Sequence, residues 1–197
     1  MGTEKIVIIT NLVSHKEKAL YIHIPKNGGH TIYPLLSSKK WADAGRPVQI
    51  STEKMKEYYL FTFVRNPYER FFSGWKSVMK SKNQSDKITP EYFKENFSMK
   101  EIDGDKVTVD IHIGMTQTQH LGNTLVHLNK IYKFEDFLTG YNEINEKFNC
   151  GGAENPKKAN VSVVVDIEKF MNNEIIDFIN KKYDIDFTNF GYKKRKI

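Results

Sequence analysis

The stretch YIHIPKNGGHTIYPLL at residues 21–36 places an apolar run before a short polar loop with two glycines, and a second apolar run after it. This order is typical of a buried strand that passes through a tight turn into a helix. Glycines let a backbone approach a ligand closely, and the first amide groups of a helix attract anions. The stretch predicts a strand–loop–helix unit that holds a phosphate or sulfate group. A plain strand–helix turn is the alternative for this stretch taken alone.

A second junction of the same kind follows the apolar run YLFTFV at residues 59–64. Arg65 leaves the end of this expected strand, Asn66 and Pro67 form a helix-start signal, and Ser73 lies on the following helix. An arginine at a strand end can donate two N–H groups to one phosphate. Two such junctions on neighbouring strands predict two anionic subsites, as a ligand phosphorylated at both ends requires.

The rest of the chain alternates between strand-like and helix-like segments. Strands are expected at 19–24, 59–64 and 130–134, and helices at about 30–37, 51–59, 66–80, 89–97, 135–148 and 166–183. This alternation predicts an α/β fold with a mainly parallel sheet and ligand loops at the carboxyl ends of the strands. The 197 residues fit a single domain, 1–197, with 1–18 as an N-terminal segment and 193–197 as a basic tail.

The composition favours a globular protein with anionic partners. The formal charge is +6, and part of it lies in the run KKRK at 193–196, which is more typical of a solvated tail than of a nucleic-acid-binding arm. Lys26, Arg65 and Arg70 differ from this tail because they stand at junctions between expected strands and helices. Arg70 has a structural alternative, a salt bridge to Glu69 or to a neighbouring helix.

The sequence contains no apolar run long enough to span a bilayer and no basic leader with a cleavage site, so a cytoplasmic location is expected. A single cysteine, Cys150, excludes an intramolecular disulfide and a multi-cysteine zinc site. The histidines show no HExxH pair, and His112, His120 and His127 do not form a convincing ligand set. No metal is expected.

Both junctions resemble the binding segments of carbohydrate sulfotransferases. IHIPKNGGHTI (22–32) is similar to their 5′-phosphosulfate loop, and FTFVRNPYERFFSGW (61–75) is similar to their 3′-phosphate segment, Arg-x-Pro-x-x-Arg-x-x-Ser. Weaker similarity covers HIGMTQTQHL, IYKFEDFLTGYNEI, PKKANVS and IIDFINKKYDIDFTNFGY, so that the resemblance extends over about residues 19–192. It implies a P-loop-like sheet flanked by helices, and the donor 3′-phosphoadenosine 5′-phosphosulfate, which leaves as 3′,5′-adenosine bisphosphate.

The resemblance also implies residue roles and a reaction. The sulfuryl group moves in line, without a metal, to an acceptor hydroxyl, and a sugar or glycan is the expected acceptor. Lys26 and the loop amides stabilise the developing charge. The residues carried over for the 5′-phosphosulfate are Pro25, Lys26, Asn27, Gly28, Gly29, His30 and Thr31; those for the 3′-phosphate are Arg65 and Ser73; those for a loop that closes over the donor are Asn160 and Ser162.

The chain departs from the family pattern at the expected general base. Many relatives have a histidine or glutamate between the two binding segments, whereas residues 32–60 contain no histidine. His112 and then His30 are the expected bases, with His120 and the carboxylates Asp43, Glu53 and Glu57 as the other groups available. His30 also stands where the family has a small hydroxyl residue, so Thr31 is expected to take that role.

Two other functions remain open from the sequence. A kinase-like phosphotransferase would use the same strand–loop–helix, but the chain lacks the Gly-Lys-Ser/Thr ending of an ATP-binding loop. A non-catalytic nucleotide- or nucleic-acid-binding protein would agree with the net charge. A nucleic-acid partner is not expected, because no basic helix face or aromatic platform is evident.

Overall fold

The computed structural model describes residues 6–9, 11–38, 41, 48–96, 112–153, 156 and 166–197. The chain forms two compact units, which are described in turn. Unit 1 comprises Met1–Val64 and Leu121–Val161, and unit 2 comprises Arg65–His120 and Ser162–Ile197. The single domain expected from the sequence stays a prediction. None of the helices in the described ranges is long and apolar enough to cross a membrane.

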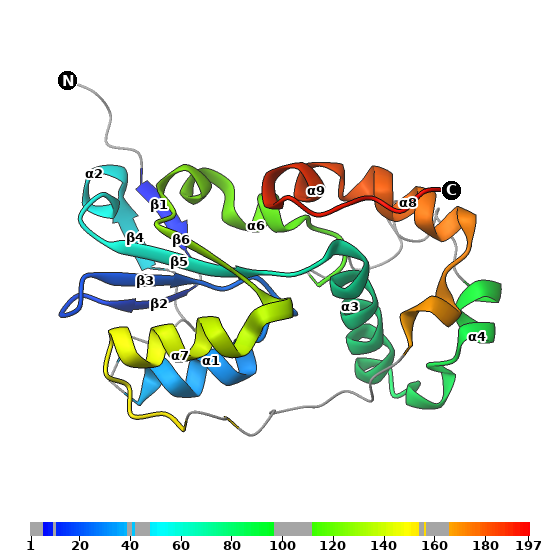
Figure 1. Cartoon of the computed structure of the whole chain (residues 1–197), viewed down its shortest axis with the longest axis horizontal. Coiled ribbons are helices and arrows are strands. Elements are labelled where there is room, and N and C mark those ends of the chain that lie inside the picture. The colour runs from blue at the N-terminus through cyan, green and yellow to red at the C-terminus, as the bar shows by residue number, and fades with distance from the viewer. Residues whose placement is uncertain are drawn as a thin grey trace. The chain divides into compact units, whose positions relative to one another are not determined.

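A four-stranded, mostly parallel sheet forms the centre of unit 1 (Figure 1). Its strands, in spatial order, are β2 (Asn11–Ser14), β3 (Ala19–Ile22), β5 (Tyr59–Val64) and β6 (Lys130–Lys133). β3 runs parallel to β5, and β5 runs parallel to β6, whereas β2 is antiparallel to β3. The α/β class and the mainly parallel sheet are therefore confirmed. The edge strand β2 was not predicted.

Helices α1 (Gly29–Ser37) and α7 (Phe137–Lys147) lie side by side against one face of this sheet (Figure 1). Aromatic side chains of the two helices contact those of the strands, with Tyr33 of α1 against Tyr21 of β3 and Phe137 of α7 against Phe63 of β5. The core of unit 1 contains Leu12, Ala19, Tyr21, Ile32, Leu35, Leu36, Trp41, Phe61, Phe63, Tyr132, Tyr141, Ile144, Phe148 and Cys150. This packing fixes where α1 begins, and thus where the loop before it lies.

Shorter elements complete unit 1. β1 (Ile6–Ile9) and β4 (Val48–Ser51) form a separate antiparallel pair. The helix α2 (Thr52–Met55) begins as predicted, because the side chain of Ser51 accepts a hydrogen bond from the amide of Lys54 at 3.3 Å. The remaining elements are the 3₁₀ turns η2 (Gly122–His127) and η3 (Phe134–Asp136).

Unit 2 is helical and is built around α3 (Pro67–Ser81). Asn66 caps this helix by accepting from the amide of Tyr68 at 3.0 Å, as the sequence signal predicted. The other elements are η1 (Ser85–Lys87), α4 (Pro90–Asn96), α6 (Gln117–Leu121, whose last residue is counted in unit 1), η4 (Ile167–Phe170), α8 (Asn173–Lys182) and α9 (Asp184–Phe190). Their aromatic core includes Tyr68, Phe71, Phe72, Phe93, Phe170, Phe178, Tyr183 and Phe187.

The C-terminal helix expected over residues 166–183 is divided in the structure. The 3₁₀ turn η4 ends at Phe170, and the chain is extended at Met171 and Asn172 before α8 begins. Asn172 causes the restart, because its side chain accepts from the amide of Ile175 at 2.9 Å and so favours a cap over a helix interior. The prediction of one continuous helix over residues 166–183 was wrong.

The basic C-terminal run, expected as a solvated tail, is anchored in unit 2 at Arg195. Its amide donates to the hydroxyl of Tyr68 at 2.8 Å, and its guanidinium lies over the Tyr68 ring. The carbonyl of Arg195 accepts from Asn180 at 3.0 Å, and Glu168 accepts two further bonds of 2.6 Å from the guanidinium. These hydrogen bonds from Arg195 lower the pKa of the exposed Glu168 carboxyl. The end of the chain is thus part of the unit's packing.

Candidate functional site

The loop between β3 and α1 turns through two residues in the left-handed region. Lys26 has φ 74° and Gly28 has φ 86°. Glycine adopts this conformation without cost, whereas a lysine there costs about 1–3 kcal/mol and persists only where its surroundings hold it. The amide of Asn27 closes the turn on the carbonyl of Ile24 at 3.3 Å. Strain of this kind clusters at ligand-binding loops.

The side chain of Asn27 ties this loop to the end of β5. It is fully buried, and its Nδ2 donates to the carbonyl of Phe63 at 2.7 Å. β3 and β5 are parallel neighbours, with Ile22 opposite Thr62, so their carboxyl ends adjoin. The side-chain amide of Asn27 thereby fastens the loop to the strand that ends at Val64, and its NH₂ group points into the protein.

Gly29 packs directly on the ring of His23, the second residue before Pro25. A Cβ added to Gly29 would lie 2.2 Å from His23 Cε1 and 2.7 Å from Nδ1. The ring itself is held by Tyr21, whose hydroxyl is 3.3 Å from His23 Nδ1, and by an edge contact with the ring of Tyr33. The His23 ring therefore supports the loop, and it leaves room only for glycine at position 29.

The start of α1 has no side-chain cap. Its N-cap is Gly28, which carries no capping side chain, and the amides of Thr31 and Ile32 both bond to the Gly28 carbonyl. Among the described residues no backbone acceptor serves the amides of Gly29 and His30. Uncapped amides at a helix start, beside a lysine and a threonine hydroxyl, suit an anionic group such as a phosphosulfate.

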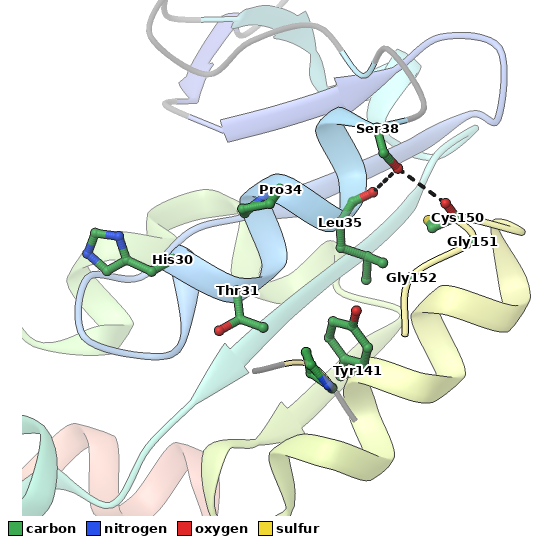
Figure 2. Close-up of a pocket in the computed structure, with 10 residues that line it drawn as sticks. His30, Thr31, Pro34, Leu35, Ser38, Tyr141, Cys150, Gly151 and Gly152 are labelled. Carbon is green, nitrogen blue, oxygen red and sulfur yellow. Dashed lines mark hydrogen bonds between the residues drawn. The ribbon is translucent and has the colours of Figure 1, made fainter. Parts of the chain in front are cut away.

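A cavity of about 360 Å³ adjoins this loop within unit 1 (Figure 2). It lies along α1, with His30 and Thr31 at the end next to the loop, and it extends to Tyr141 of α7 and to Cys150. Burial raises the pKa of Tyr141, so its hydroxyl stays neutral as a donor or acceptor. A ligand held at the loop has space to extend into this cavity.

The far wall of the cavity is held by hydrogen bonds to the segment at residues 150–152. Ser38 Oγ donates to the carbonyls of Leu35 at 2.6 Å and Cys150 at 3.2 Å (Figure 2). Asn145 makes two reciprocal bonds to Gly152, of 2.8 and 2.9 Å. Cys150 is buried, forms no disulfide and packs in the core of unit 1.

In unit 2, Arg65 comes directly after β5 and is held at both its ends. Its Nε and Nη2 donate to Glu69 Oε2 at 3.2 and 3.1 Å, one helical turn later. Its backbone exchanges two hydrogen bonds of 2.8 Å with the side chain of Gln117. The guanidinium remains partly exposed, so a phosphate can still reach it.

Arg70 is a structural residue, but its hydrogen-bond partner is the Met115 carbonyl and not Glu69. Glu69 pairs with Arg65, whereas Arg70 is 1% exposed and its Nη1 donates to the carbonyl of Met115 at 2.9 Å. Burial lowers the pKa of Arg70, while the nearby Tyr183 and Asp186 raise it. An arginine remains charged under these conditions, so Arg70 holds the 115 segment against α3.

Ser73 lies half-buried on α3, beside a close contact with the segment of His112. A Cβ added to Gly74 would lie 2.7 Å from the carbonyl oxygen of His112, so α3 and this segment touch through backbone. His112 is itself half-buried. No pattern in the sequence indicates this contact, because Gly74 reads as an ordinary helix residue.

The structure places the expected site residues as follows. Within unit 1 it gathers Pro25, Lys26, Asn27, Gly28, Gly29, His30 and Thr31 in one turn. Within unit 2 it places Arg65 just before α3 and Ser73 near the middle of that helix. Asn160 and Ser162, together with the carboxylate Asp43, lie outside the described residues. Glu53 and Glu57 are exposed.

A family model described as the sulfotransferase family matches residues 10–193. The chain belongs to the sulfotransferase family. The resemblance seen in the two binding segments is confirmed, and the matched range includes both. Searches of curated proteins and of solved structures find no match.

Two residues that support the expected binding segments, one in each unit, were not identified from the sequence. His23 lies in an apolar strand-like run and is not one of the residues carried over from the family motif, although it stands two residues before the loop that it supports. Gln117 was noted only as part of a segment that is similar to relatives. Its bond to Arg65 spans 52 residues, and no local pattern predicts such a pair.

Proposed function

We propose that this sulfotransferase moves a sulfuryl group from 3′-phosphoadenosine 5′-phosphosulfate to a hydroxyl of an acceptor, with a sugar or glycan as the acceptor class. The observation that carries the proposal is the uncapped turn before α1. There Lys26 and Gly28 are both left-handed, and the amides of Gly29 and His30 have no backbone acceptor within the described ranges. An anion completes the hydrogen bonding of such a turn.

Each end of the donor has its own residues in this proposal. Lys26, the loop amides and Thr31 bind the 5′-phosphosulfate, and Arg65 with Ser73 binds the 3′-phosphate; Asn160 and Ser162 complete the donor site from outside the described residues. During transfer, negative charge builds on the sulfuryl oxygens and on the leaving phosphate. Lys26 and the amides, already oriented by the turn, stabilise that charge without reorganising. The side chain of Asn27 keeps the turn attached to β5.

Acceptor deprotonation is assigned to a histidine, and we place His30 before His112. His30 is the second residue of α1 and its side chain is exposed, so it adjoins the loop proposed to hold the sulfuryl group. A general base must come within hydrogen-bond reach of the acceptor hydroxyl. This order is the reverse of the one expected from the sequence, in which His112 came first.

We expect His30→Ala to lower kcat about 100-fold, at the lower end of the range for a lost general base, and to leave the affinity for 3′,5′-adenosine bisphosphate unchanged. The measurement is the release of this bisphosphate from the donor in the presence of a chemically desulfated glycan. Added imidazole restores part of the rate if the missing group is a base. His15→Ala, in an exposed turn, is the matched control. A normal rate in His30→Ala, with a loss in His112→Ala, contradicts the assignment.

Ligand-induced thermal stabilisation tests the proposed function itself. We expect 3′,5′-adenosine bisphosphate to raise the melting temperature, whereas ATP–Mg²⁺ and a short oligonucleotide do so weakly or not at all. Stabilisation follows RT ln(1 + [L]/Kd), so a ligand at about 100 times its Kd adds about 2.7 kcal/mol. Arg65→Ala and Lys26→Ala should each reduce the shift.

The comparison between ligands separates the sulfotransferase from its alternatives. An equal response to ATP–Mg²⁺ favours a phosphotransferase, and a response to the oligonucleotide alone favours a nucleic-acid-binding protein. Either result, or no response to the bisphosphate, rejects the proposed donor. Circular dichroism of the two variants confirms that a smaller shift does not come from misfolding.

A further inference from the structure

The buried side chain of Gln117 is bonded to both polar groups of the Arg65 backbone. The amide of Arg65 donates to Gln117 Oε1 at 2.8 Å, and Gln117 Nε2 donates to the carbonyl of Arg65 at 2.8 Å. Gln117 has no exposed surface. Because both bonds run to one planar amide, the backbone of Arg65 is fixed in position and in orientation, as a strand partner would fix it.

The position of Gln117 is itself fixed by Asp186 of α9. This carboxylate is fully buried and accepts three hydrogen bonds of 2.8 Å, from the amides of Gln117 and Thr118 and from the hydroxyl of Thr118. A buried carboxylate is costly unless donors surround it, so these three bonds hold the start of α6 firmly to α9. Asp186 therefore supports Gln117, and Gln117 supports Arg65.

The guanidinium of Arg65 is oriented separately. Glu69 accepts from its Nε and Nη2, and the Arg65 side chain is 19% exposed. A surface ion pair between an arginine and the glutamate four residues later contributes little to stability. The pair with Glu69 therefore does not by itself explain why a buried glutamine also holds the Arg65 backbone. A mobile arginine loses conformational entropy when it binds a phosphate. Because the backbone and the side chain of Arg65 are both held beforehand, the entropy cost of binding is smaller.

We propose that Gln117, supported by Asp186, is a positioning residue that determines where Arg65 presents its guanidinium to the 3′-phosphate of the donor. The inference rests on the proposed function, in which Arg65 binds that phosphate. Gln117 does not touch the ligand and acts through Arg65. Its removal should weaken recognition of the 3′-phosphate and leave recognition of the rest of the nucleotide intact.

The test compares two ligands in two matched variants. The affinity ratio between 3′,5′-adenosine bisphosphate and adenosine 5′-phosphate isolates the contribution of the 3′-phosphate, and titration calorimetry measures both. We expect Gln117→Met to lower this ratio about tenfold, an effect of about 1.4 kcal/mol, with the affinity for adenosine 5′-phosphate unchanged. Gln119→Met is the control: Gln119 lies on the same helix and accepts from the amide of Thr116 at 2.8 Å, so that variant also loses a hydrogen bond and should keep the ratio.

A second pair of variants covers the case in which Gln117→Met does not fold. Gln117→Glu keeps the acceptor for the Arg65 amide and loses the donor to its carbonyl, and Gln119→Glu adds the same charge two residues away. A lower ratio in Gln117→Glu alone supports the positioning role. An unchanged ratio in a folded Gln117 variant, or an equal loss for both nucleotides, overturns it. A wild-type chain that does not distinguish the two nucleotides instead rejects the assignment of Arg65 in the proposed function.

Discussion

Lys26→Asn should lower the rate of sulfuryl transfer about 10²–10³-fold, the loss typical of removing one group that stabilises transition-state charge. Asparagine is chosen because Lys26 has φ 74°, and asparagine tolerates the left-handed region better than alanine does. The variant thus removes the ammonium group and keeps the turn. The measurement is the steady-state release of 3′,5′-adenosine bisphosphate from the donor with a desulfated glycan present.

Lys18→Asn is a closely matched control for this variant. Lys18 is also a lysine with positive φ, at 45°, in the turn between β2 and β3, and it pairs with Glu57 at the surface. The same change of charge and of side chain is thus made at the same kind of backbone. If the two variants lose activity equally, the effect of Lys26→Asn comes from net charge or stability, and its role in transfer is wrong.

The parts of this fold that were predicted correctly are those encoded by neighbouring residues. The aromatic and β-branched run at 59–64 predicted β5 with the bounds that the strand has, because such residues pack well between two covered faces. Asn66 followed by Pro67 predicted the start of α3, since both the capping side chain and the fixed φ act within one turn. The loop after β3 was found for the same reason.

The features that were missed depend on residues far apart in the chain. The edge strand β2 is four residues long and exists through its pairing with β3, in a stretch with no strong strand pattern. The anchoring of Arg195 on Tyr68 joins positions 127 residues apart, and a basic tail alone predicts only solvation. Gln117 belongs to the same class, because its role follows from the backbone atoms that it meets and not from its neighbours in sequence.

The contact between Gly29 and His23 leads to the second large expected effect. Gly29 stands at the first position of α1, so alanine suits its backbone and would ordinarily stabilise the helix by up to about 1 kcal/mol. Here its Cβ would lie 2.2 Å from the His23 ring, which Tyr21 and Tyr33 hold in place. We expect Gly29→Ala to destabilise the protein by about 1–3 kcal/mol, the usual cost of overpacking.

To relieve the overlap between the Cβ added in Gly29→Ala and the His23 ring, the loop must shift. This shift moves the backbone amides that the proposed mechanism uses. We expect kcat of Gly29→Ala to fall about 10²–10³-fold, because donors aimed at developing charge lose most of their effect when they shift. His23→Ala removes the ring, so the double variant Gly29→Ala/His23→Ala should regain most of the rate and the stability that Gly29→Ala loses. A double-mutant cycle on both quantities measures this coupling. If the double variant is as impaired as Gly29→Ala alone, the loop does not rest on His23, and glycine is needed there because the bound anion itself leaves no room for a Cβ.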